Sequence, residues 1–100
     1  MEENAVYAVA QWKVRAGNLG GVLQALRELA QSSRTEEGNI LYEAHHAVDD
    51  NHVIILYEGY RSQAALQAHR ESEHFQQLVL GIIVPLLEHR EVVPLAKLPL

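Results

Sequence analysis

The spacing of apolar residues in the first third of the chain predicts a strand followed by a helix. Residues 5–14 are rich in β-branched and aromatic side chains, which is typical of a strand. From Leu19 to Ala30 the apolar residues recur every three or four positions, which is the period of one helix face. Asn18 is the expected N-cap of this helix, and Gly38 is the expected left-handed residue that ends it.

The next two apolar segments predict a β-hairpin. Residues 39–48 and 52–60 have the composition of strands, and Asp49-Asp50-Asn51 between them favours a tight turn. A turn of three residues places Tyr42 opposite Glu58, whereas a turn of even length would move Tyr42 to the other face. The neighbouring pairs in the three-residue case are Ile40 with Tyr60 and Ala44 with Leu56.

Two serines mark the second helical region. Ser62 is expected to cap a helix that runs to about residue 71, and Ser72 is expected to cap its continuation to about residue 80. Residues 90–98 predict a last strand, in which Pro94 fits best at a sheet edge or a bulge.

The expected order of elements is β-α-β-β-α-β over a single domain, residues 1–100. This order predicts the α+β class and a ferredoxin-like fold, with one antiparallel sheet and both helices on one of its faces.

Apolar residues occupy both faces of the predicted sheet. In the third strand Ile54 and Leu56 lie on one face, and Val53, Ile55 and Tyr57 lie on the other. The helices can cover only one face, and an exposed apolar patch of this size is typical of an interface. We therefore predict an obligate homodimer, in which the sheets of two copies pack face to face into a dimeric α+β barrel.

Composition excludes several classes of function. The net charge is −5, and the eight Lys and Arg residues are spread along the chain, which argues against nucleic-acid binding. The absence of cysteine excludes disulfides and thiolate sites. The longest apolar run, residues 78–87, is too short for a membrane span, and Glu2-Glu3-Asn4 does not resemble a signal peptide. We therefore expect a cytoplasmic protein without nucleic-acid or membrane partners.

Three ionisable residues near the second helix are candidates for acid–base chemistry. A buried Glu58 would have a raised pKa and could exchange protons near neutral pH. The alternative is a structural Glu58, bonded to a backbone amide or to Arg61. His69 and His74 could also transfer protons, or could simply bond to backbone carbonyls at a helix end.

The histidine pattern does not predict a metal site. His45 and His46 are neighbours in a strand and point to opposite faces. No two histidines are four residues apart on a helix with a suitable acid. We therefore expect no metal ligands. Trp12 is expected in the core or in a pocket wall.

Four short motifs resemble the antibiotic biosynthesis monooxygenase family over nearly the full chain. They are Glu37-Gly38, Glu58-Gly59-Tyr60, Ala65-Leu66-Gln67-Ala68-His69 and Ser72-Glu73-His74-Phe75. The resemblance implies ferredoxin-like subunits that form dimers, with a cleft between sheet and helices. It also implies oxidation of quinols or polycyclic phenols by molecular oxygen, without flavin, haem or metal.

The resemblance assigns roles to the candidate residues. Glu58 or His69 would remove a phenolic proton, and aromatic and apolar side chains would hold the ring. The expected catalytic residues are Glu58, His69 and His74, and the expected substrate-binding residues are Trp12, Tyr42, Leu56, Tyr60, Leu66 and Phe75. Leu56 stands where polyketide-oxidising members have asparagine. Val79 stands where the haem-degrading branch has its axial histidine, so we expect no haem and no other cofactor.

Two alternatives remain open. The chain also resembles the isomerase branch that processes the phosphorylated autoinducer-2 signal, at Glu36-Glu37-Gly38-Asn39 and Tyr57-Glu58-Gly59-Tyr60. An isomerase of such a hydroxy-dione would need a cation for the phosphate, for which Arg61 or Arg70 could serve. The third possibility is a noncatalytic binding or stress-response module that uses the same cleft.

Overall fold

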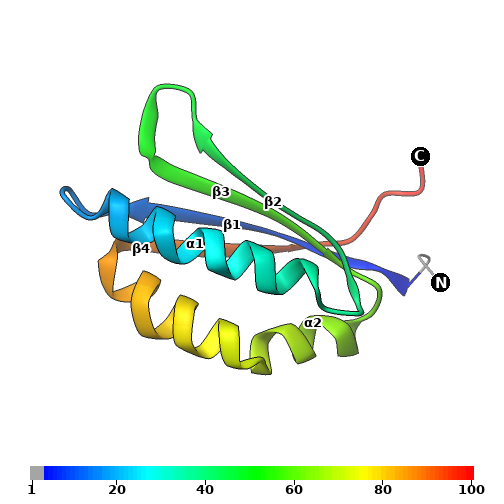
Figure 1. The fold of residues 1–100 in the computed structure, drawn as a ribbon. Coiled ribbons are helices and arrows are strands. Elements are labelled where there is room, and N and C mark those ends of the chain that lie inside the picture. Colours follow the sequence, from blue (N-terminus) through cyan, green and yellow to red (C-terminus); the bar gives the residue numbers. More distant parts are fainter. Residues whose placement is uncertain (1–3) are drawn as a thin grey trace.

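The computed structural model describes residues 4–100, in which four strands form one antiparallel sheet with the order β2-β3-β1-β4. The helices run along one face of this sheet, α1 in the opposite direction to α2 and the segment that follows it (Figure 1). The elements are β1 (Val6–Val14), α1 (Leu19–Arg34), β2 (Asn39–Ala47), β3 (Asp50–Tyr60), α2 (Gln63–Glu71), η2 (Phe75–Ile83), η3 (Val84–Leu86) and β4 (Leu87–Leu95). The predicted ferredoxin-like α+β fold is therefore confirmed. Glu2 and Glu3, on which the expectation about a signal peptide rests, lie outside the described residues.

The core lies between the sheet and the helices because both have the period that the sequence predicts. Alternate residues of β1 and β3 are buried under the helices, and so is one face of α1. The largest fully buried apolar side chains are Trp12, Tyr60, Leu29, Ile54, Leu56 and Ile83. None of the helices between residues 4 and 100 has the length and apolar character that a bilayer crossing requires.

The second helical region continues beyond its expected end near residue 80. After α2, η2 is a π-helix of nine residues that extends to Ile83. The Val84 N–H bonds to the Val79 carbonyl, five residues earlier, as the wider π turn requires. Val79 and Ile83 are buried against the core. A π-helix of this length is rare.

The three residues predicted as N-caps precede helical segments, but only the two serines make capping hydrogen bonds. The Ser62 hydroxyl accepts the Ala65 N–H at 3.1 Å, and the Ser72 hydroxyl accepts the Phe75 N–H at 3.2 Å. Asn18 is the N-cap residue of α1, but its side chain makes no capping hydrogen bond.

The expected left-handed conformation of Gly38 is wrong. The α1 helix already ends at Arg34, and among residues 4–100 only Gly17 has a positive φ, of 86°. Gly38 is required for a different reason, because a Cβ at this position would collide with the Cβ of Ala65 in α2. The loop before β2 can therefore lie directly against α2.

The hairpin turn differs from the prediction, yet the pairing beside it is correct. The turn is Val48-Asp49, with Ala47 paired to Asp50, rather than residues 49–51. A register shift in β3 then compensates for the even turn length. Tyr42 opposite Glu58 and Ala44 opposite Leu56 are confirmed. The pairing of Ile40 with Tyr60 is wrong, because a second shift at Ile40 pairs Asn39 with Tyr60.

The last strand begins three residues earlier than predicted, at Leu87, and ends at Leu95. It lies at the edge of the sheet, where Pro94 costs no hydrogen bond with a further strand, as expected. On the sheet face away from the helices, Val9 pairs with both Tyr57 and Val93. Val93 remains 42% exposed, so this face carries apolar side chains that the helices do not cover.

The contact between Gly38 and Ala65 predicts a stability difference between two glycine substitutions. Gly38→Ala should lower the free energy of unfolding by about 1–3 kcal/mol, because the new methyl group overpacks the contact with α2. Gly20→Ala is the matched control, because Gly20 lies in α1 with no atom within 4 Å of the added Cβ. It should be neutral or stabilise by up to about 1 kcal/mol. Urea unfolding measures both values, and equal effects would contradict the close approach.

Candidate active site

A cleft of about 490 Å³ lies between the helix-facing side of the sheet and the α2–η2 segment. Its walls combine apolar side chains with polar ones, and the ionisable groups come mainly from β3, α2 and β4. Seven of the nine residues predicted for the site line it, namely Trp12, Tyr42, Leu56, Glu58, Leu66, His69 and Phe75. Tyr60 and His74 lie behind the wall and contact the lining residues from there.

His69 is the buried polar residue of the cleft wall, with 2% of its side chain exposed. It occupies the last turn of α2 and points toward the sheet, as its spacing from Leu66 predicts. Its ring lies 5.1 Å from the Tyr60 ring and 5.2 Å, edge to face, from the Phe75 ring. Because aromatic side chains surround the imidazole, its orientation is restricted by packing as well as by hydrogen bonds.

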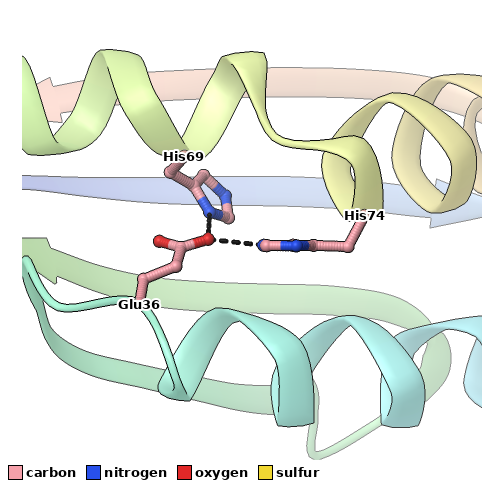
Figure 2. Close-up of side chains that lie close together, drawn as sticks. All are labelled: Glu36, His69 and His74. Carbon is pink, nitrogen blue, oxygen red and sulfur yellow. Dashed lines mark hydrogen bonds and ion pairs between the residues drawn. The ribbon is translucent and has the colours of Figure 1, made fainter.

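Glu36 forms hydrogen bonds with both candidate histidines. One of its carboxylate oxygens, Oε2, lies 2.7 Å from Nδ1 of His69 and 2.5 Å from Nε2 of His74 (Figure 2). The three side chains come from the loop after α1, from α2 and from the residue before η2. Among residues 4–100 neither ring bonds to a backbone carbonyl, which was the alternative explanation for both histidines.

Glu36 is the residue that sequence reasoning did not assign to the site. It is separated from His69 by 33 positions and lies in an irregular loop, so no helical or strand period connects the two. The signal that could have identified it is the Glu36-Glu37-Gly38-Asn39 motif. Gly38 permits the loop to approach α2, and the approach brings Glu36 to His69.

The carboxylate determines which imidazole nitrogen carries the proton. Because Glu36 accepts at Nδ1, we assign the proton of neutral His69 to this atom. The other nitrogen, Nε2, is then a proton acceptor and lies 3.8 Å from Oε1 of Glu58. The pair has the geometry of an oriented general base, with a carboxylate behind the imidazole and a cleft in front of it.

Glu58 is a largely buried carboxyl with a phenol partner. Burial raises its pKa, while the hydrogen bond from Tyr60 and the nearby His69 act in the opposite direction. The donor is the Tyr60 hydroxyl at 2.8 Å, rather than the facing Tyr42 that the register suggested or the alternative Arg61. Burial and the Glu58 carboxyl also raise the pKa of Tyr60, which keeps the phenol protonated as a donor.

Two further features of the cleft could orient a bound molecule. The indole N–H of Trp12 is buried and has no hydrogen-bond partner among residues 4–100. Arg70 and Arg90 also line the cleft, and neither forms an ion pair within this part of the chain. Arg90 pairs with Trp12 across the β1–β4 ladder, so the two side chains project from the same face of the sheet. Arg61, the other cation considered for a phosphate, is exposed and does not line the cleft.

Comparison with known proteins matches the chain to one family. A family profile described as antibiotic biosynthesis monooxygenase matches residues 5–79. A curated relative from Bacillus subtilis (strain 168), named "Putative monooxygenase YcnE", is 33% identical over 67 residues, which are 67% of this chain and 70% of that protein. The crystal structure of PA3566 from Pseudomonas aeruginosa is similar with a TM-score of 0.88 at 28% identity, over 98% of each chain. The structure of Rv0793 from Mycobacterium tuberculosis has a TM-score of 0.87 at 27% identity, over 94% of this chain and 95% of that one.

The raised pKa of Glu58 predicts a pH-dependent effect of Glu58→Gln on stability. The folded state binds the Glu58 proton more tightly than the unfolded chain does. This carboxyl therefore lowers the free energy of unfolding as the pH rises from its ordinary value of 4.5 through the raised pKa. Glutamine does not titrate and can still accept the Tyr60 hydrogen bond. We expect urea unfolding to show a higher free energy of unfolding for the variant, relative to the wild type, at pH 8 than at pH 4.5. If the free energies of unfolding of the variant and the wild type differ by the same amount at both pH values, the raised pKa of Glu58 is contradicted.

Proposed function

The chain belongs to the antibiotic biosynthesis monooxygenase family, and from this premise we propose that it oxidises a small quinol or other phenolic compound with molecular oxygen, without a cofactor. The observation that carries the proposal is the arrangement of His69. Its Nδ1 bonds to Glu36, and its Nε2 lies 3.8 Å from Glu58 in the wall of the cleft.

The cleft has the parts that deprotonation of a phenol needs. Nε2 of His69 takes the proton from the phenolic oxygen, and Glu36 stabilises the imidazolium that forms. The apolar part of the cleft wall would pack against the ring of the phenol. The indole N–H of Trp12 is buried in the cleft wall without a hydrogen-bond partner among residues 4–100, and the ring would have to move to offer it to a substrate oxygen.

Oxygen reacts with the phenolate without a further reductant. One electron passes from the anion to O₂, and the resulting radical pair forms a bond between a ring carbon and oxygen. Protonation by His69 gives a ring hydroperoxide. The hydroperoxide then loses water. The proton on the same ring carbon leaves together with the terminal OH group, and a carbonyl group remains. A phenol and O₂ thus give a quinone and one water molecule, and the substrate supplies all four electrons.

Glu58 and His74 have different roles in this proposal. Glu58 lines the cleft, and its raised pKa suits it to exchange a proton with a second oxygen of a quinol. His74 does not line the cleft, and its ring bonds to Glu36 behind His69. We therefore propose His74 as a positioning residue rather than a catalytic one.

The cations of the cleft favour one alternative function. Arg70 and Arg90 could bind a phosphate, and an isomerase of a phosphorylated hydroxy-dione would use the same imidazole as a proton carrier. Such an isomerase would consume no oxygen. A noncatalytic binding module would neither consume oxygen nor interconvert a dicarbonyl.

We also propose that two copies of the chain pair through the sheet face that the helices leave open. Val9, Tyr57 and Val93 are neighbours on this face and give it an apolar centre. Pairing would bury these side chains in a second core and would support the strands that form the cleft floor on their other side.

Oxygen uptake with a panel of hydroquinones tests the proposed reaction. The wild type should consume O₂ above the rate of autoxidation and should place one atom of ¹⁸O₂ in the product. His69→Ala should lower kcat by about 100-fold or more, because general-base catalysis contributes about 10²–10⁴-fold. Glu36→Gln should also lower kcat, because the amide no longer fixes the Nδ1 proton.

The matched control for these variants is His46→Ala, an exposed histidine on β2. It should retain wild-type uptake. Full activity of His69→Ala with folded protein would refute the assigned base. If no hydroquinone is consumed but a phosphorylated hydroxy-dione is interconverted, the isomerase alternative is correct.

Sedimentation velocity at micromolar concentration tests the pairing. The wild type should sediment as a dimer. Val9→Lys should shift it toward the monomer, because a charge would lie between Tyr57 and Val93 in the interface. Glu28→Lys, on the exposed side of α1, is the control and should remain dimeric. A monomeric wild type would refute the proposal.

A further inference from the structure

We propose that Glu36, His69 and His74 form a binding site for one divalent transition metal ion, such as Zn²⁺ or Co²⁺, on the side of the His69 ring that faces away from the cleft. Two imidazole nitrogens and a carboxylate oxygen are a donor set that binds such ions, with the remaining positions left to water. The site is distinct from the cleft, because neither Glu36 nor His74 lines it.

The three donor atoms are already gathered. One atom from each side chain lies within 4.8 Å of the others, and both nitrogens point at the same carboxylate oxygen (Figure 2). Around an ion with bonds of about 2.1 Å, donor atoms lie roughly 3.0–3.4 Å apart. The present separations of 2.5 and 2.7 Å to Oε2 of Glu36 are those of hydrogen bonds, so an ion would have to widen these contacts to enter.

The second oxygen of Glu36 supports the proposal independently. Oε1 is buried and has no hydrogen-bond partner among residues 4–100. An unpartnered buried carboxylate oxygen is costly, and a cation held by both oxygens of Glu36 would remove that cost. The side chains of His74 and Glu36 are 22% and 17% exposed, so an ion can reach them from solvent without passing through the cleft.

A carboxylate lies near the other ring nitrogen of His69, and it would have to come closer than its present 3.8 Å to accept an N–H from that atom. If Nδ1 binds the ion, Nε2 carries the proton and points at Glu58, 3.8 Å away. A histidine ligand commonly donates its other N–H to a carboxylate. Glu58 is in turn held by the Tyr60 hydroxyl at 2.8 Å.

The ion would reverse the role of His69 in the cleft. Without it, Nδ1 donates to Glu36 and Nε2 accepts a proton; with it, Nδ1 is a ligand and Nε2 is a donor. A bound ion should therefore inhibit the proposed deprotonation of a phenol. This consequence rests on the proposed function, whereas the metal site itself does not.

Titration of the full chain with Co²⁺, followed by its visible absorption, and with Zn²⁺, followed by calorimetry, tests the site. We expect one ion per chain. His74→Ala and Glu36→Gln should each weaken the affinity by more than about tenfold, because each removes a ligand or its charge. Glu58→Gln should weaken it by about tenfold, as expected for a carboxylate that supports a histidine ligand.

Matched controls separate this site from weak surface binding. His45→Ala and His46→Ala, on β2, should leave the affinity unchanged. His74 is partly exposed, so His74→Ala should fold, and circular dichroism verifies this. No bound ion, or unchanged affinity in folded His74→Ala, would overturn the proposal.

Oxygen uptake with and without Zn²⁺ distinguishes failure of the metal site from failure of the proposed function. Co²⁺ binding that depends on His74 supports the metal site even if no hydroquinone is consumed. Oxygen uptake by a chain that binds no ion refutes the metal site and leaves the monooxygenase proposal intact. If both occur, Zn²⁺ should inhibit uptake in the wild type, and a chelator should restore it.

Discussion

The hydrogen bond between Nδ1 of His69 and Glu36 connects the fold to the site. An imidazole that is 2% exposed must find partners within the protein, and Glu36 supplies one at 2.7 Å. Because Glu36 lies in the loop before β2, this bond also fastens that loop to α2. The contact of Gly38 with Ala65 permits the approach, and the Arg61 N–H bonds to the Gly38 carbonyl at 2.8 Å. Loop, helix and β3 therefore hold one another in the geometry that the cleft needs.

The elements that follow a regular period could be predicted from the sequence, and those that depend on distant contacts could not. The strand and helix periods, the element order and the burial of His69 beside Leu66 follow from spacing alone. Glu36 could not be assigned in this way, because a loop residue has no period and its partner lies 33 positions away. The same holds for Gly38, whose lack of a side chain matters for contact with α2 rather than for its own backbone conformation.

The hairpin shows how a correct register can follow from an incorrect turn. The predicted pairing of Tyr42 with Glu58 assumed a turn of three residues, whereas the turn has two. The register shift in β3 adds residues to one strand, which restores the pairing that burial favours. The apolar pattern of the two strands determines their faces, and the turn adapts to it. Burial is therefore the stronger predictor of register here, and turn composition the weaker one.

The two nitrogens of His69 lie in different surroundings, and this difference gives the residue its possible functions. Nδ1 faces a carboxylate and a second imidazole near the surface, and Nε2 faces Glu58 at the cleft. A neutral imidazole carries one proton on one of its two nitrogens. Loss of the proton from Nδ1 therefore places it on Nε2. Under the two proposals, a proton on Nδ1 leaves Nε2 free to accept a proton from the cleft, whereas a metal ion on Nδ1 makes Nε2 a donor. Groups outside the cleft would then control its chemistry through one ring that is packed in the core.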